Sequence, residues 1–326
     1  MEHPPTIAAI DLGSNSFRLE IGFFRGSEFV RQHYIKRTLR QGACLENGCL
    51  SAAAMQAGWA CLAEFGQLLH QHQVQHARAV ATQTLREARN SADFVREGSR
   101  LLGGLPIDII SGEQEAALIY RGVASQLPPS TDRRLIVDLG GRSTEITLGQ
   151  GLQAQQLASY PLGSVLWTGR FFGDGVLSEA AFAQAEAAAS TVLAQAATLF
   201  PIGSWDCAYA SAGTATAVSD VLAAHGHGAS PITRAEVYWL RAQLLRCGHI
   251  GQLALPGLRA DKAPVVAGGL SVLLALFHTL QLQAMVPAQG ALRIGVLHSL
   301  CNPTGGCGGA VSLALFILSG WFRTCS

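Results

Sequence analysis

The chain has 326 residues, of which 14% are charged, and its formal net charge is +1. This balance provides no basic field for nucleic acid and no support for a membrane-surface role, so an anionic ligand would have to be held by a local site. The length suits two domains, because a single hydrophobic core stops growing at roughly 250–300 residues. The sequence also lacks Gly-Lys-Ser/Thr, which excludes a Walker-type phosphate loop.

The N-terminus lacks the positive start and the apolar core of a signal peptide, so we expect a cytoplasmic protein. The 8 cysteines form no Cys-x-x-Cys pair and have no histidine at zinc spacing. Free thiols in a reducing compartment are the expected state.

Strands and helices alternate along the first half of the chain. The expected elements are strands at residues 7–10, 28–36, 77–81 and 106–110, and helices at 51–73, 93–102 and 111–125. Ser51 is the expected N-cap of the first helix. This alternation predicts an α/β sheet.

The second half repeats the plan after a linker at residues 127–133, which contains two prolines. The expected elements are a hairpin from residue 135, a third strand to 160, helices at 178–200, a strand at 207–209 and a helix at 288–300. We therefore expect domains at 1–126 and 127–300. Residues 301–326, a Gly/Cys run before an apolar stretch too short to span a membrane, form an atypical tail that we interpret as frameshifted or truncated.

One segment of twelve residues occurs twice, starting at Asp11 and at Asp138. Both copies share Asp, Leu, Gly, Ser and a closing Gly at one offset. Each follows an apolar run and predicts strand, Gly turn, strand, with a carboxylate at the entry. Such a turn exposes N–H groups and hydroxyls that suit a phosphate. A single copy could be an ordinary β-turn, but two copies in register indicate duplicated structure with a shared site.

Several motifs together resemble the exopolyphosphatase / guanosine pentaphosphate phosphohydrolase family. They include Asp11-Leu12-Gly13-Ser14-Asn15, Thr84-Leu85-Arg86-Glu87-Ala88, Gly112-Glu113-Gln114-Glu115, Asp138-Leu139-Gly140-Gly141, Ser211-Ala212-Gly213-Thr214 and Leu292-Arg293-Ile294-Gly295. The resemblance covers residue 7 to about residue 300. It implies an α/β fold of two related, duplicated actin-like (ribonuclease H-like) domains, with the active site in an interdomain cleft.

The resemblance also implies roles for individual residues. Glu115 matches the catalytic glutamate, the base that would orient an attacking water. Mg²⁺ is the expected cofactor, with oxygen ligands from Asp11, Asp138 and Glu145. The expected phosphate-binding residues are Gly13, Ser14, Asn15, Arg86, Gly140, Gly141, Arg142, Ser143, Gly213 and Thr214. For Glu115 the alternative is a plain carboxylate at a helix start, and for Arg86 a solvated helix arginine.

Two departures from the family pattern affect these expectations. Arg142 stands where a third glycine is usual, and its side chain could bind phosphate or point outward. Longer family members continue into a helical domain after the position of Leu300, so processive action on long polymers is in doubt.

The leading hypothesis is hydrolysis of terminal phosphoanhydride bonds of inorganic polyphosphate, with release of orthophosphate. The alternative within the family is 5′-phosphohydrolysis of guanosine pentaphosphate, and the shared motifs do not separate the two substrates. A more distant alternative is an ATP-dependent kinase or chaperone ATPase of the same fold. We expect no nucleic-acid or membrane partner, and the sequence leaves open whether the chain forms a homodimer.

Overall fold

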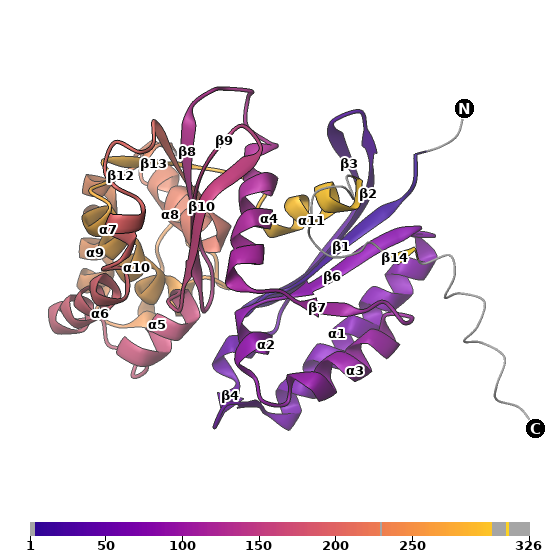
Figure 1. Cartoon of the computed structure of the whole chain (residues 1–326). Helices are drawn as coiled ribbons and strands as arrows, with labels where there is room; N and C mark the ends of the chain where they lie inside the picture. Colours follow the sequence, from indigo (N-terminus) through magenta and orange to yellow (C-terminus); the bar gives the residue numbers. More distant parts are fainter. Residues whose placement is uncertain (1–3, 229, 302–310, 313–326) are drawn as a thin grey trace, which may run out of the picture. The chain divides into compact units, whose positions relative to one another are not determined.

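The computed structural model describes residues 4–228, 230–301 and 311–312 (Figure 1). These residues form two compact units. Unit 1 extends to Gln114 and takes up the chain again from Leu292, whereas unit 2 comprises Glu115–Ala291. Each unit is described by itself below.

Unit 1 is built on a mixed sheet with the strand order β14-β6-β1-β2-β3, in which β7 also pairs with β6. Its strands are β1 (Ile7–Leu12), β2 (Ser16–Arg25), β3 (Glu28–Thr38), β4 (Leu45–Glu46), β5 (Cys49–Leu50), β6 (His76–Ala81), β7 (Ile107–Ile109) and β14 (Val311–Ser312). Its helices are α1 (Ala52–Gln71), α2 (Gln83–Glu87), α3 (Ser91–Leu101) and α11 (Leu292–Cys301).

Helices α1 and α3 lie side by side against one face of this sheet, and α11 packs on β1 and β6 (Figure 1). Helix α1 begins where expected, because the Ser51 side chain accepts a hydrogen bond from the Ala54 N–H. Close packing of the two helices requires glycine: a Cβ atom at Gly66 would lie 2.2 Å from the Leu101 carbonyl oxygen. The fully buried Phe65 and Phe94 contribute to the core of unit 1.

Unit 2 contains a second mixed sheet, with the strand order β10-β9-β8-β11-β13-β12. Its strands are β8 (Arg133–Leu139), β9 (Thr144–Gln150), β10 (Gln153–Tyr160), β11 (Cys207–Ser211), β12 (Ile232–Thr233) and β13 (Ala284–Pro287). Its helices are α4 (Gly112–Ala124), α5 (Ser164–Phe171), α6 (Glu179–Val192), α7 (Ala196–Leu199), α8 (Ala212–Ala224), α9 (Arg234–Cys247) and α10 (Val266–Thr279). Helix α10 is almost entirely buried and packs against α5, α6 and α9.

The two sheets share one pattern of strand pairing. In unit 1, β1 and β3 each pair antiparallel with β2, and β6 pairs parallel with β1. In unit 2, β8 and β10 each pair antiparallel with β9, and β11 pairs parallel with β8. This agreement confirms the prediction of two related α/β domains, whereas a cleft between them stays a prediction.

The division into units falls at other residues than the predicted boundaries at 126 and 300. Helix α4 lies mostly in unit 2, because its residues bond to that sheet: Thr147 Oγ1 donates to the Ala116 carbonyl at 3.4 Å. Residues 292–301 belong to unit 1 because α11 packs on β1 and β6. The helix expected at 288–300 begins only at Leu292. Residues Ala284–Pro287 form β13, and the Ala288 N–H continues its pairing by donating to the Ala210 carbonyl of β11. Apart from Cys301, Val311 and Ser312, the predicted tail lies outside the described residues.

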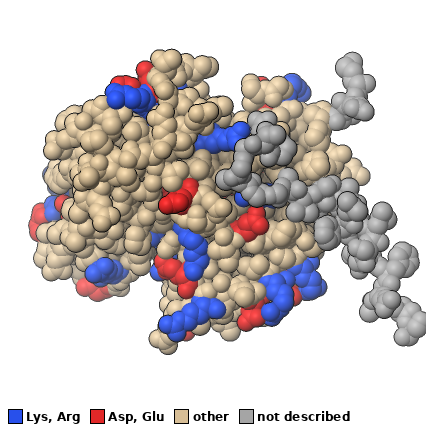
Figure 2. All heavy atoms as spheres, viewed as in Figure 1, with Lys and Arg blue, Asp and Glu red and all other residues tan. Residues whose placement is uncertain are grey.

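Acidic and basic side chains form small mixed groups on the face shown in Figure 2. This distribution agrees with the balanced composition of the chain. Among the described residues, no helix combines the length and the apolar character that a membrane span needs.

Candidate active site

Four side chains of unit 2 form a row across its sheet. The strand register places Ser159 of β10 opposite Glu145 of β9, Glu145 opposite Asp138 of β8, and Asp138 opposite Ser211 of β11. Residues paired across neighbouring strands project to the same face of a sheet. The register therefore brings together four polar groups that are far apart in the sequence.

The serines at the two ends of the row hold the carboxylates in its middle. Ser159 Oγ donates a hydrogen bond to Glu145 Oε1 at 2.8 Å, and Ser211 Oγ donates to Asp138 Oδ2 at 2.5 Å. Both carboxylates are buried, with exposed fractions of 2% for Glu145 and 6% for Asp138. A buried carboxylate needs such donors, because burial removes the water that would otherwise solvate its charge.

Glu115 belongs to the same electrostatic group. Burial raises the pKa of Glu145 well above its usual value, and the nearby charges of Glu115 and Asp138 raise this pKa further. Hydrogen bonds to Ser159 and Ser143 act in the opposite direction. Glu115 itself is only 6% exposed and lies near the start of α4. We call these three buried carboxylates, Glu115, Asp138 and Glu145, whose charges interact, the buried acidic set.

The second Gly turn, residues 140–143, is anchored through its carbonyl groups. The Gly140 carbonyl accepts a hydrogen bond from the Ser164 N–H, and the Gly141 carbonyl accepts one from the Val165 N–H. Gly163 permits this approach, because a Cβ atom there would lie 2.6 Å from the Arg142 nitrogen. These bonds tie the turn to the start of α5.

The third predicted phosphate segment, Gly213-Thr214, lies in the first turn of α8. A Cβ atom at Gly213 would lie only 2.0 Å from Lys262 Nζ, so the glycine leaves room for this ammonium group. Lys262 had no assigned role in the sequence analysis. The sequence distinguishes Lys262 only by the rarity of lysine, because Lys262 and Lys36 are the only lysines of the chain.

Unit 1 contains the equivalent row, but its charges differ. Asp11 of β1 is opposite Arg18 of β2, and Arg18 is opposite Lys36 of β3. Arg18 Nη1 lies 3.0 Å from Asp11 Oδ2, and Arg293 Nη1 of α11 lies 3.7 Å from the same oxygen. Asp11 and Asp138 thus have the same place in their sheets, whereas their neighbours are cations in one unit and a carboxylate in the other.

The first Gly turn is also held by its carbonyl groups. The Arg40 N–H donates to the Asn15 carbonyl at 2.9 Å, and the Gly42 N–H donates to the Ser14 carbonyl at 2.8 Å. Asn15 Oδ1 is buried and has no hydrogen-bond partner among the described residues. A ligand or a water molecule bound at this turn could satisfy that oxygen.

Arg86 is held by neighbours within unit 1. Its Nη1 donates to the Ile110 carbonyl at 2.7 Å, and its Nε and Nη2 donate to Gln83 Oε1 at 3.1 and 2.6 Å. Arg86 is therefore an ordered, partly buried side chain rather than the solvated helix arginine considered as the alternative.

The predicted metal ligands fit a cation unequally. Asp138 and Glu145 supply the hard oxygen atoms that Mg²⁺ prefers, and a cation would relieve the repulsion between neighbouring carboxylates. Asp11 fits less well, because Arg18 already pairs with it at 3.0 Å; Arg293 lies 3.7 Å from Asp11 and pairs more closely with Glu20, at 3.0 Å. Within the described part of the chain, no three His, Cys, Asp or Glu side chains are grouped so that they could hold a metal ion. Mg²⁺ therefore stays a prediction.

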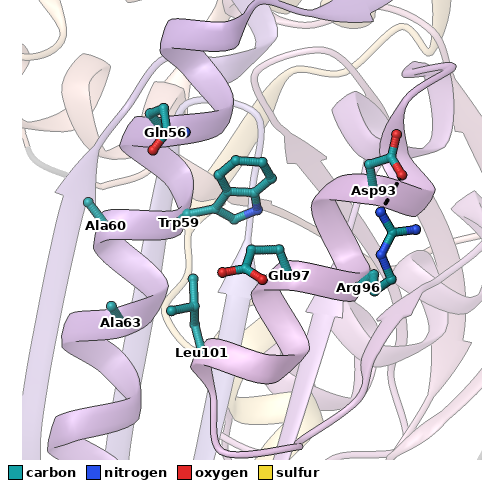
Figure 3. A pocket seen from close by; sticks show the side chains of 8 residues that line it. All are labelled: Gln56, Trp59, Ala60, Ala63, Asp93, Arg96, Glu97 and Leu101. Carbon is teal, nitrogen blue, oxygen red and sulfur yellow. Dashed lines mark hydrogen bonds and ion pairs between the residues drawn. The ribbon is translucent and has the colours of Figure 1, made fainter.

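A surface pocket of about 530 Å³ lies between α1 and α3 of unit 1 (Figure 3). Trp59 and Leu101 supply apolar surface, and Asp93 and Glu97 stand on its charged side. The Trp59 Nε1–H donates to the Phe94 carbonyl at 3.1 Å, which fixes the indole ring. None of the predicted catalytic, phosphate-binding or metal-binding residues lines this pocket.

Solved structures with similar folds include an exopolyphosphatase-like protein, with 23% sequence identity and a TM-score of 0.80 over 90% of this chain and 97% of that chain. An exopolyphosphatase from Cytophaga hutchinsonii has 21% identity and a TM-score of 0.82, over 91% of this chain and 98% of that chain. At these identities the similarity shows the fold alone.

The chain is more similar in sequence to two guanosine-5′-triphosphate,3′-diphosphate pyrophosphatases. The protein from Aeromonas salmonicida is 39% identical over 94% of this chain and 62% of the relative, and the protein from Vibrio cholerae is 38% identical over 91% of this chain and 59% of the relative. The chain thus spans about three fifths of their length. The model of the Ppx/GppA phosphatase family matches residues 28–303, which confirms the resemblance stated from the motifs, and the chain belongs to this family.

Proposed function

We propose that this chain hydrolyses a terminal phosphoanhydride bond and that guanosine pentaphosphate is its preferred substrate. The observation that carries the proposed chemistry is the buried acidic set of Glu115, Asp138 and Glu145 in unit 2. The choice of substrate rests on the relatives, which are 38–39% identical and whose names specify this nucleotide. Guanosine pentaphosphate, the alternative in the sequence analysis, thus replaces inorganic polyphosphate as the leading substrate.

Glu115 is the proposed base. Hydrolysis requires a water molecule aligned with the terminal phosphorus and a group that accepts its proton. A carboxylate can do this only when it is ionised.

Cationic and N–H groups supply the other half of the chemistry. The phosphoryl oxygens need donors as charge develops on them. The proposed donors are the N–H groups of the turn at residues 140–143, the Lys262 ammonium group beside Gly213 and the Arg86 guanidinium group. Mg²⁺, when bound, would be held by Asp138 and Glu145 and would neutralise phosphate charge. A cytoplasmic location is part of the proposal.

The test is phosphate release by the full chain in the presence of Mg²⁺. Guanosine pentaphosphate, polyphosphate and ATP are compared at matched concentrations of terminal phosphate. We expect a kcat/KM at least about tenfold higher for guanosine pentaphosphate, a difference of about 1.4 kcal/mol in transition-state binding. A preference for polyphosphate would reverse the substrate choice, and phosphate transfer from ATP to a sugar would favour the kinase alternative.

Glu115→Gln is the critical variant. Loss of a general base lowers kcat by about 10²–10⁴-fold, whereas nucleotide binding should change little. Glu113→Gln, at an exposed glutamate two residues earlier on the same helix, is the matched control. Equal activities of the two variants would remove Glu115 from the role of base.

A further inference from the structure

Arg86 lies at the end of a short chain of hydrogen bonds on α2. Glu87 Oε1 accepts a hydrogen bond from Gln83 Nε2 at 2.6 Å. The other end of the same amide group, Gln83 Oε1, accepts bonds from Arg86 Nε at 3.1 Å and Arg86 Nη2 at 2.6 Å. The order of the chain is therefore Glu87, Gln83, Arg86.

This arrangement fixes the direction of the Gln83 amide group. A primary amide has a donor end and an acceptor end. Because the Glu87 carboxylate can accept only from the donor end, the acceptor end must face the guanidinium group. Gln83 therefore presents an oxygen to one edge of Arg86, and the Ile110 carbonyl binds Nη1. The Arg86 side chain is held from two directions.

An alternative is ordinary pairing on a helix surface, because Gln83 and Glu87 are four residues apart and Gln83 and Arg86 three. Such pairs normally involve flexible, exposed side chains. Here all three side chains are partly buried. Ile110, which follows β7, also lies 24 residues from Arg86 in the sequence. This longer contact fixes Arg86 against the body of unit 1, which surface pairing does not require.

We propose that Gln83 is a positioning residue that, together with Glu87, orders the Arg86 guanidinium group to bind a phosphate group of the substrate. A planar guanidinium group binds phosphate best when its orientation is set beforehand, because less side-chain freedom is then lost on binding. The inference rests on the proposed function, since it assigns the phosphate to the substrate of that activity. It concerns substrate binding rather than the attack of water.

The test compares variants of the full chain with guanosine pentaphosphate, starting from the wild type. We expect Gln83→Ala to raise KM about tenfold, the usual scale for one charge-assisted hydrogen bond, with a smaller change in kcat. Gln83→Glu should also raise KM, because it places a second carboxylate beside Glu87. The double variant Gln83→Glu/Glu87→Gln exchanges the two groups, restores the order of donors and acceptors, and should recover most of the loss. Gln71→Ala, at an exposed glutamine of α1 in the same unit, should leave KM unchanged.

A double-mutant cycle separates positioning from general stabilisation. If Gln83 acts through Arg86, Gln83→Ala should have little further effect on KM in an Arg86→Ala background. An unchanged KM in Gln83→Ala, a lowered KM, or equal effects in both backgrounds would overturn the inference. A wild-type chain that releases no phosphate from any substrate would instead overturn the proposed function. Melting temperatures of all variants show whether folding is affected.

Discussion

Arg18 and Glu145 occupy equivalent positions in the two sheets and carry opposite charges. Each is the strand neighbour of the aspartate at the end of a central strand, Asp11 in unit 1 and Asp138 in unit 2. The backbone plan of the duplicated unit is the same in both copies, but its chemistry differs. One copy pairs its aspartate with a cation, and the other places it beside a second carboxylate that serines hold in place.

The ion pair in unit 1 leads to a prediction about stability. Arg18→Met should lower the free energy of unfolding by about 1–3 kcal/mol, because the buried Asp11 loses its nearer cation, while the more distant Arg293 is already paired with Glu20. Arg96→Met is the matched control, since the pair of Arg96 with Asp93 is exposed, with side-chain exposures of 76% and 59%. That control should change stability by no more than about 0.5 kcal/mol. Urea unfolding measures the stability of both variants. Equal losses of unfolding free energy would show that burial of Asp11 does not make its ion pair more important than an exposed one.

The serine at one end of the unit 2 row leads to a second prediction. Ser211→Ala removes the hydroxyl donor of a buried carboxylate and should lower the free energy of unfolding by about 1–3 kcal/mol. In an Asp138→Asn background the same change should cost less, because a neutral amide loses less than a carboxylate when its donor is removed. Chemical denaturation of the four proteins gives the coupling energy. A coupling near zero would show that the hydrogen bond contributes nothing measurable.

The raised pKa of Glu145 predicts a specific dependence of stability on pH. Some carboxyl groups have a higher pKa in the folded state than in the unfolded state. Such a group makes its full contribution to stability when the pH is below the pKa of the unfolded state, which is near 4.5 for glutamate. That contribution is lost as the pH rises from about 4.5 towards the raised pKa of the folded state. Glu145→Gln has no such proton to lose, so its stability relative to the wild type should increase with pH over this range.

Unfolding free energies measured from pH 4 to pH 8 with a chelator present test this expectation. Asp206→Asn serves as a control whose stability relative to the wild type should stay constant over this range, because hydrogen bonds from Arg133 lower the pKa of Asp206 from 3.8 to about 2. Its stabilising effect is present above pH 3.8 and is lost as the pH falls towards 2, outside the measured range. A stability difference for Glu145→Gln that is constant with pH would show that the carboxyl group does not titrate differently on folding.

The contact between Gly213 and Lys262 leads to a fourth prediction. Gly213→Ala should displace the Lys262 ammonium group, because the new Cβ atom would lie 2.0 Å from Nζ. The flexible end of the lysine can move, so we expect a small loss of stability, below about 1 kcal/mol, and a larger rise in KM for the phosphate substrate. Lys262→Met should raise KM to a similar degree, and the double variant should show no additive effect. Additive effects would indicate two independent roles.

The local helices, strands and turns, and the duplication of the sheet plan, could be predicted from the sequence alone. The Ser51 cap, the hairpins at the two Gly turns and the alternation of strands with helices arise from neighbouring residues, so they could be predicted without long-range contacts. The motifs also pointed to Glu115, Asp138 and Glu145, which the structure places in one buried set.

Which distant side chains meet depends on how the chain packs. Ser159 and Ser211 reach the carboxylates because the strand register aligns four strands, and that register depends on pairing between segments far apart in the chain. Lys262 reaches Gly213 and Arg293 reaches Asp11 through helix packing, which leaves no periodic signal near either residue. For the same reason, the shared Asp-Leu-Gly motif did not show how the surroundings of the two aspartates differ. Asp11 lies beside arginines, whereas Asp138 accepts a hydrogen bond from a serine.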